Sequence, residues 1–145
     1  MAAATYDLSV GGTTALPCVF AGKVAVVEKT VDFAVDSVGN GETADVINIP
    51  ANTLVLGVSV YVNTAESTDT IDVGDSDTAA LYIDDGSLAV ADVTLWSDGS
   101  AGTGRILVAA KTKYYTAANA IRVLANAALA TGKITVRALM VQFTP

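Results

Sequence analysis

The sequence predicts an all-β protein, a single-domain β-sandwich that is jelly-roll-like and carries an extended N-terminal arm. The chain has 145 residues, which fits one domain with a core large enough to fold without disulfides or metals. Valine, threonine and isoleucine number 20, 17 and 7, so 44 residues are β-branched and favour a pleated sheet over a helix. Short alternating apolar runs, separated by turn signals, follow from Thr30 onward and are typical of a sandwich.

The first 29 residues differ from the rest, because their alternation is weak and Gly11-Gly12 interrupts it. We expect residues 1–29 to form an arm and residues 30–145 to form the β-sandwich domain. Within the arm, edge strands are expected at residues 15–20 and 23–28.

The longest period-two run covers residues 54–63 and has no charge on either face, which predicts a central strand. Its apolar face is expected to carry Leu54, Leu56, Val58, Val60 and Val62. A turn signal at residues 131–133 predicts that the last two strands of the chain form a hairpin. The other expected strands cover residues 30–36, 46–49, 71–73, 81–83, 105–110, 121–126 and 134–143.

Two stretches leave alternatives open. Residues 86–95 fit a short helix or an irregular crossing segment, because their periodicity does not separate the two. Residues 117–130 are rich in alanine, which favours helix, so a helix competes there with the strand at residues 121–126. Residues 97–104 are expected to form a loop.

Composition argues against several functions. No apolar run reaches the roughly 18 residues that span a bilayer, and no signal peptide is recognisable, so no membrane partner is expected. The net charge of −7 argues against a nucleic-acid partner. The chain has no histidine, the commonest general base and metal ligand. Cys18, the single cysteine, is expected to be a small buried hydrophobe.

One acidic stretch resembles a metal site. Asp72, Asp75 and Asp77, preceded by Asp69, are closely spaced carboxylates of the kind that can bind calcium. Their spacing departs from the EF-hand loop, and the bidentate glutamate of that loop is missing. The alternative is a solvated strand end that is rich in turn-forming aspartate.

A second acidic pair raises the question of a glycosidase, since such enzymes use two carboxyl groups. Asp84 and Asp85 are adjacent, and we expect adjacent strand residues to point to opposite faces. The aromatic residues Trp96, Tyr114 and Tyr115 are few for a sugar platform and are more typical of a core or an interface. No serine-nucleophile or phosphate-binding motif occurs either. We therefore expect a non-enzymatic protein without catalytic residues or cofactors.

Charge is distributed unevenly along the chain. Residues 1–29 are balanced, residues 30–98 contain thirteen acids and no base, and residues 99–145 contain six bases and no acid. Strands from different thirds can pair and neutralise one another. An acidic surface and a more basic seam can also meet different partners, and the two interpretations are compatible.

The last expected strand is apolar on both faces. Such a strand is either central in a sandwich or covered by a second chain, and its place late in the chain favours the second. One face carries Ile134, Val136, Ala138 and Met140. The other face supplies the candidate interface residues Arg137, Leu139, Val141 and Phe143.

Four stretches carry a family resemblance: residues 49–58 (IPANTLVLGV), 70–77 (TIDVGDSD), 115–121 (YTAANAI) and 130–136 (ATGKITV). In this order they resemble the small β-sandwich structural proteins of tailed bacteriophages, which include capsid decoration, or cement, proteins. The resemblance spans about residues 30–143. Its motifs specify turns and strand ends rather than catalysis, so they speak to fold more than to function.

The resemblance implies a virion structural protein at the capsid surface, which binds across neighbouring subunits of the major capsid protein and stabilises the shell. It also implies a homo-oligomer, for which we expect a trimer. The arm is expected to contact the shell or a neighbouring protomer through its apolar residues Leu16, Val19, Phe20, Val24 and Val26. The alternative is a receptor- or carbohydrate-binding head-fibre or tail module, which requires Trp96, Tyr114 and Tyr115 to face solvent.

Overall fold

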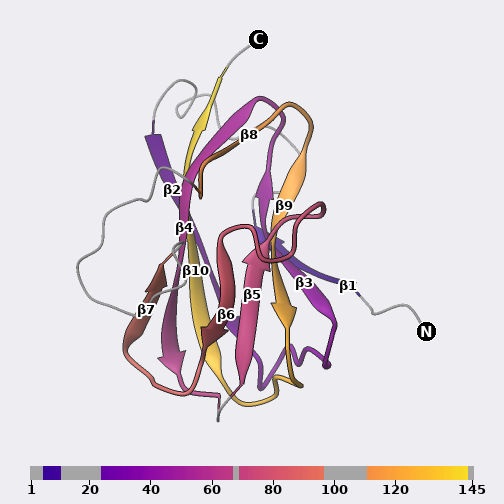
Figure 1. Cartoon of the computed structure of the whole chain (residues 1–145), viewed down its shortest axis with the longest axis vertical. Helices are drawn as coiled ribbons and strands as arrows, with labels where there is room; N and C mark the ends of the chain where they lie inside the picture. Colours follow the sequence, from indigo (N-terminus) through magenta and orange to yellow (C-terminus); the bar gives the residue numbers. More distant parts are fainter. Residues whose placement is uncertain (1–4, 11–23, 67–68, 97–110, 144–145) are drawn as a thin grey trace.

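The computed structural model describes residues 5–10, 24–66, 69–96 and 111–143, which form two β-sheets packed face to face (Figure 1). Within these ranges, no helix is long and apolar enough to cross a membrane. The strands are β1 (Thr5–Val10), β2 (Val24–Asp32), β3 (Thr43–Ile49), β4 (Thr53–Thr64), β5 (Thr70–Gly74), β6 (Ile83–Ser87), β7 (Val93–Trp96), β8 (Lys113–Tyr115), β9 (Asn119–Ala125) and β10 (Lys133–Gln142).

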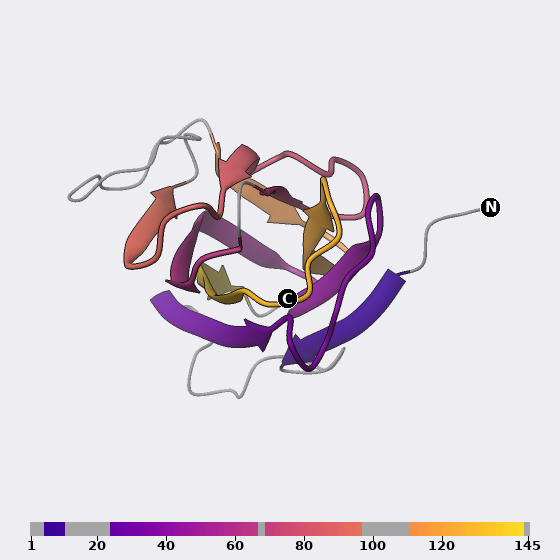
Figure 2. The same ribbon diagram turned by 90° about the horizontal axis from the view of Figure 1, so that it is seen from below.

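The strand order confirms the predicted jelly-roll sandwich. Sheet A has the order β1-β3-β9-β5-β6, and sheet B has the order β2-β10-β4-β7, with β8 also paired to β4. From β2 to β5 each strand lies in the sheet opposite its predecessor, and the chain crosses again before β7, β9 and β10. The result is two interleaved sheets, as in a jelly roll. β1 pairs parallel with β3, and it lies beside β2 along one side of the sandwich (Figure 2).

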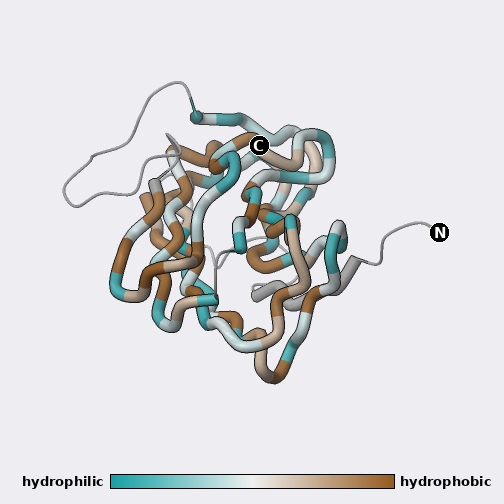
Figure 3. Tube along the Cα trace, turned by 60° about the horizontal axis from the view of Figure 1, so that its bottom comes forward, coloured by the Kyte–Doolittle hydropathy of each residue, from teal (hydrophilic) through white to brown (hydrophobic). Residues whose placement is uncertain are grey.

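The hydrophobic core fills the space between the sheets. Hydrophobic and hydrophilic residues alternate along the strands (Figure 3), and the inward-facing positions are buried. On β10 the buried apolar positions are Ile134, Val136, Ala138 and Met140, as the alternation predicted. This face lies in the core between the two sheets, so the chain itself covers it and no second chain is needed. β10 is also central within sheet B, where it lies between β2 and β4.

β2 is longer than the sequence pattern suggested. It runs without interruption across the expected boundary between residues 29 and 30, and residues 33–36 form a turn instead of continuing the strand. Its alternation holds on both sides of that boundary, because Ala25 and Val31 are buried while Val26 and Thr30 are exposed. The strand expected at residues 15–20 lies outside the described residues.

The expected terminal hairpin is wrong. β9 and β10 lie in different sheets, so the chain between them passes from one sheet to the other. Leu129 in this connection is fully buried, and it exchanges backbone hydrogen bonds of 3.0 and 2.8 Å with Val38. Burial of Leu129 therefore draws the connection across the end of the core. A tight turn between β9 and β10 would leave Leu129 in solvent.

The two ambiguous stretches contain no described helix. Residues 119–125 of the alanine-rich stretch form β9, and residues 93–96 form β7 after an irregular crossing segment. The strand expected at residues 81–83 is wrong in position, because β6 covers Ile83–Ser87. Tyr82 comes just before this strand, and its side chain is buried. The expected loop at residues 97–104 and the strand at residues 105–110 lie outside the described part of the chain.

A β-bulge divides β4 and overturns the expectation that its alternating residues share one face. Leu139 of β10 pairs with Gly57 and Met140 pairs with Val55, so Leu56 is an extra residue on β4. At this point the set of alternate residues that faces the core changes from odd-numbered to even-numbered positions. Val58, Val60 and Val62 face the core, whereas Leu54 and Leu56 are partly exposed on the other face.

Candidate interaction surface

An apolar row crosses the outer face of sheet B near the start of β2. Val24 of β2 lies opposite Val141 of β10. Val141 in turn lies opposite Leu54 of β4, which pairs with Tyr114 of β8. Four strands thus place large apolar side chains side by side, and Val24 and Tyr114 are 59% and 48% exposed.

A second apolar row lies next to the first. Val26, which is 63% exposed, lies opposite Leu139 of β10. The Phe143 ring contacts Tyr114 edge-on at a centroid distance of 6.1 Å, and it is 45% exposed. Of six exposed large hydrophobic side chains among the described residues, four belong to these rows or contact them. We name this surface the sheet B patch, made of Val24, Val26, Leu54, Leu56, Tyr114, Leu139, Val141 and Phe143.

Few charges lie next to the sheet B patch. Glu28 and Arg137 lie opposite each other on β2 and β10 and form an ion pair of 3.0 Å. The Arg137 guanidinium also lies over the Tyr61 ring at 5.8 Å. The Tyr61 hydroxyl donates to the Asp92 carboxylate, and this hydrogen bond raises the pKa of Tyr61. The patch is therefore bordered by one neutralised ion pair and by one carboxylate, that of Asp92, which the Tyr61 hydroxyl binds.

The outer face of sheet A is acidic. Asp45 is paired with Arg122 across β3 and β9 at 2.5 Å. Asp72, Asp84 and Asp85 have carboxylate oxygens within 4.8 Å of one another, and Asp84 and Asp85 are exposed. The expectation that Asp84 and Asp85 point to opposite faces is wrong. Asp85 has φ 50° and lies in a bulge between β5 and β6, which breaks the strand alternation.

The predicted cation ligands Asp72, Asp75 and Asp77 do not share a site. Asp75 and Asp77 both bind the Lys113 ammonium, at 2.6 and 3.3 Å. Asp72 lies on the sheet A face, where it accepts hydrogen bonds from the Asp85 backbone and the Asn126 amide. The sequence spacing placed these acids close together along the chain, but the end of β5 separates Asp72 from the other two.

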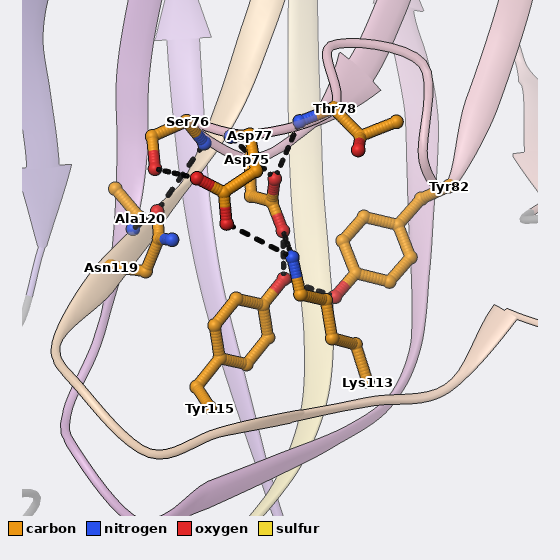
Figure 4. A network of polar contacts seen from close by, with 9 residues as sticks. All are labelled: Asp75, Ser76, Asp77, Thr78, Tyr82, Lys113, Tyr115, Asn119 and Ala120. Atoms are coloured by element: carbon orange, nitrogen blue, oxygen red, sulfur yellow. Dashed lines mark hydrogen bonds and ion pairs between the residues drawn. The ribbon is translucent and has the colours of Figure 1, made fainter.

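A buried polar network joins the two sheets (Figure 4). The Asp75 side chain is fully buried after β5, and one of its oxygens accepts from the Tyr115 hydroxyl at 2.7 Å and from Lys113, both on β8. Its other oxygen accepts from the backbone N–H of Asp77 and Thr78 at 2.9 and 2.8 Å. The Tyr82 hydroxyl lies 2.8 Å from that of Tyr115.

The pKa shifts within this network agree with its geometry. Burial acts to raise the pKa of Asp75, but hydrogen bonds from Lys113, Tyr115 and the backbone outweigh it and hold the pKa below its usual value. Burial raises the pKa of Tyr82 to about 12 and raises that of Tyr115 as well. The Asp75 hydrogen bond raises the pKa of Lys113. The network therefore contains a carboxylate, an ammonium and two neutral phenols, a stable arrangement that links the sheets.

Glu66 forms a second polar link between distant segments. Its buried carboxylate accepts from the backbone N–H of Ala130, Thr131 and Gly132 and from the Thr131 hydroxyl. Burial acts to raise the pKa of Glu66, and the four hydrogen bonds together lower it. The connection after β4 is thereby tied to the connection between β9 and β10.

Charges from different thirds of the chain neutralise each other locally. The ion pairs join Arg122 to Asp45, Lys113 to Asp75, Lys133 to Asp32 and Arg137 to Glu28. Each base comes from the last third of the chain and each acid from an earlier third. The separated charge distribution in the sequence thus becomes paired when the strands interleave, as the first of the two interpretations predicted.

The structure gathers part of the predicted interface. Val24, Val26, Leu139, Val141 and Phe143 all lie in the sheet B patch, with Arg137 beside it. The expected contacts Leu16, Val19 and Phe20, and also Cys18, lie outside the described residues. Sequence reasoning missed Leu54, Leu56 and Tyr114, since strict alternation assigned both leucines to the core. Gly57 within the run was the available signal, because glycine inside a strand often marks a bulge.

Tyr114 and Tyr115, two of the three aromatic residues expected for a sugar platform, lie in different environments. Tyr115 is buried, and its hydroxyl belongs to the Asp75 network. Tyr114 is exposed but packs against Phe143 in the sheet B patch. The side chain of Trp96 is not among the described ones.

Comparison with known proteins identifies the fold. No protein-family model matches the chain, and no curated protein sequence matches it. A chain in the solved capsid of Ralstonia phage GP4 superposes with a TM-score of 0.61 at 17% identity, covering 91% of this chain and 92% of that one. A chain in the capsid asymmetric unit of cyanophage Pam1 superposes with a TM-score of 0.56 at 24% identity, covering 89% of this chain and 91% of that one. The same fold therefore extends over nearly the whole of each chain.

Proposed function

We propose that this chain is a non-enzymatic structural protein of a bacteriophage virion, and more specifically a decoration or cement protein at the capsid surface. The observation that carries the proposal is the shared jelly-roll fold, matched over about nine-tenths of each chain in two phage capsid structures. The order of the motifs at residues 49–58, 70–77, 115–121 and 130–136 supports the same assignment.

The proposed mechanism is mechanical. The protein binds across neighbouring subunits of the major capsid protein and stabilises the assembled shell by binding it in preference to its separated subunits. A homo-oligomer, for which we propose a trimer, engages several subunits at once, so that later contacts are intramolecular and strengthen the whole attachment. The sandwich suits this role because buried polar links at Asp75 and Glu66 tie distant segments together, in addition to the hydrophobic core.

We also propose that the residues before β2 act as an arm that contributes shell contacts. Truncation before Val24 leaves β2 intact but also removes β1, the edge strand of sheet A that pairs with β3. Circular dichroism and thermal melting therefore verify first that the remaining strands still fold. We expect the truncated protein to bind undecorated shells more weakly than the full chain. Equal binding of the two proteins would remove the arm from the mechanism while leaving the decoration role in place.

Binding to shells assembled without this protein tests the central proposal. Purified full-length chain is added to such shells, bound protein is measured by co-sedimentation, and its position is determined by electron microscopy of the particles. We expect saturable binding at the outer surface and increased resistance of the shells to heat or denaturant. Absence of binding, or a location in the tail, would contradict the proposal. Sedimentation velocity of the free protein tests the trimer independently.

A further inference from the structure

We infer that the sandwich binds its shell through the outer face of sheet B, with the acidic outer face of sheet A directed away from the shell. This assignment rests on the proposed function, because it names the face with which a shell-binding protein makes contact. The partner that it specifies is an apolar, uncharged protein surface presented repeatedly by the assembled shell.

The first argument is the concentration of exposed apolar side chains. Val24, Val26, Tyr114 and Phe143 are between 45% and 63% exposed and lie together on the sheet B patch. Exposed hydrophobic residues scattered singly are normal, but a contiguous patch marks an interaction surface. Val35 and Val90, the other exposed large hydrophobic residues of the described chain, lie outside the strands of this face.

The second argument is the way in which the patch is built. The bulge at Leu56 turns Leu54 and Leu56 out of the core and onto this face. Without it, strict alternation would bury both leucines and turn Thr53, Val55 and Gly57 outward instead, which is a smaller apolar surface. β-Bulges characteristically redirect side chains at functional surfaces. Here the redirected residues extend the patch from β2 and β10 to β4 and β8.

The third argument is the difference in charge between the two outer faces. On the sheet B face the charges of Glu28 and Arg137 cancel in an ion pair, and Asp92 at the border leaves one negative charge. On the sheet A face Arg122 cancels only Asp45, which leaves Asp72, Asp84 and Asp85 as net negative charge. Burying the sheet A face would require desolvating three close carboxylates, which is costly without a basic partner. The sheet B face avoids this cost.

The size of the patch favours a repeated shell surface over a second copy of this chain. Tyr114 and Phe143 are each about half exposed, and aromatic side chains present about 150–250 Å², so the two rings add ~200 Å². With the aliphatic residues the patch reaches on the order of 400 Å², about half of the ~800 Å² per partner in a stable two-protein complex. A contact of this size becomes firm when several are made together on one particle.

The test uses two matched valine substitutions in the full-length chain. Val26 and Val90 are 63% and 60% exposed, so Val26→Glu and Val90→Glu place the same charge at equally accessible positions on and off the patch. Thermal melting verifies that both variants fold. We expect Val26→Glu to weaken binding to undecorated shells at least tenfold, because the new carboxylate is buried without a partner, and Val90→Glu to stay within twofold of wild type.

A measurement on the wild-type protein tests the orientation without any variant. Carbodiimide labels accessible carboxyl groups, and labelling of free and shell-bound protein is compared by peptide mass spectrometry. We expect shell binding to protect Glu28, which borders the patch, and to leave Asp84 and Asp85 fully labelled. Protection of Asp84 and Asp85 with Glu28 unchanged would overturn the assignment.

Other outcomes are equally informative. Unchanged shell binding by Val26→Glu would overturn the assignment of this face while leaving the decoration role intact. Wild-type self-association that Val26→Glu abolishes would show that a second copy occupies the patch, which also overturns it. Absence of wild-type binding to shells would contradict the proposed function itself, and the assignment would fall with it.

Discussion

The Asp75 network offers the sharpest test of how the two sheets are held together. Asp75→Asn keeps the size of the side chain and removes its charge. The amide oxygen can still accept from the backbone N–H of Asp77 and Thr78, which bind one carboxylate oxygen. The amide nitrogen then replaces the oxygen that accepts from Lys113 and Tyr115, so the ammonium loses its buried partner.

The expected cost follows from those two contacts. Hydrogen bonds to charged groups contribute about 1.5–3 kcal/mol each, and removing one member of a buried ion pair costs about 3–5 kcal/mol. The Lys113 side chain is 30% exposed, so water partly solvates the freed ammonium and the cost should lie near 3 kcal/mol. With a urea m-value of about 1–3 kcal/mol/M, a loss near 3 kcal/mol should lower the unfolding midpoint by ~1–3 M.

Urea unfolding followed by circular dichroism measures this difference, and Asp77→Asn is the matched control. Asp77 binds the same ammonium at 3.3 Å, but its side chain is 69% exposed, so its removal should cost less than about 1 kcal/mol. Equal effects of the two substitutions, or a loss below about 1 kcal/mol for Asp75→Asn, would refute the view that burial makes this carboxylate important.

The pH dependence of the same pair provides a sign test. The folded-state pKa of Asp75 lies below the unfolded value of about 3.9, so the stability that Asp75 contributes is present above about pH 4. It is lost as the pH falls through the folded-state pKa. The difference in unfolding free energy between wild type and Asp75→Asn should therefore be constant near neutral pH and become smaller below about pH 4. A gap that widens in acid would contradict the assigned ionisation.

Three further predictions test other features of the sandwich. Leu56→Ala should lower the free energy of unfolding in urea by less than about 1 kcal/mol, and Val58→Ala should lower it by about 2 kcal/mol. The reason is that the bulge leaves Leu56 partly exposed and Val58 in the core. A larger loss for Leu56→Ala than for Val58→Ala would show that the bulge is misplaced. Glu66→Gln should lower the free energy of unfolding by about 2–3 kcal/mol, because it weakens the hydrogen bonds from Thr131 and Gly132. Glu28→Gln, at an exposed ion pair, should lower it by less than about 1 kcal/mol. Similar losses for the two variants would contradict the link between the two connections. Burial raises the pKa of Tyr82 from about 10 to about 12, so the stability that its neutral phenol contributes is complete below about pH 10 and is lost as the pH rises toward 12. Ultraviolet titration of wild type and Tyr82→Phe measures the pKa of this phenol by difference. If the phenol that the substitution removes ionises near pH 10, the prediction is wrong.

Local chemistry alone was enough to predict the class of fold. β-branched residues dominate the composition, and period-two patterns with glycine and proline breaks predicted most strands of the sandwich, including β4 and β10. These features are local, because they depend on the conformational preferences of single residues and on spacing along one strand. The charge distribution along the chain separately suggested, as one of two compatible interpretations, that charges from its different thirds would pair.

The tertiary structure decided which strands became neighbours and which residues faced outward. Burial of Leu129 places β9 and β10 in different sheets, although the sequence between them reads as a turn. Asp75 became a buried link rather than a cation ligand, because Lys113 and Tyr115 reach it from β8, about 40 residues away in the chain. The sheet B patch arises from one extra residue in β4, a feature of pairing with β10 that alternation within β4 does not show. Sequence patterns therefore determined that this chain folds as a sandwich, and long-range packing determined which of its faces is available to a partner.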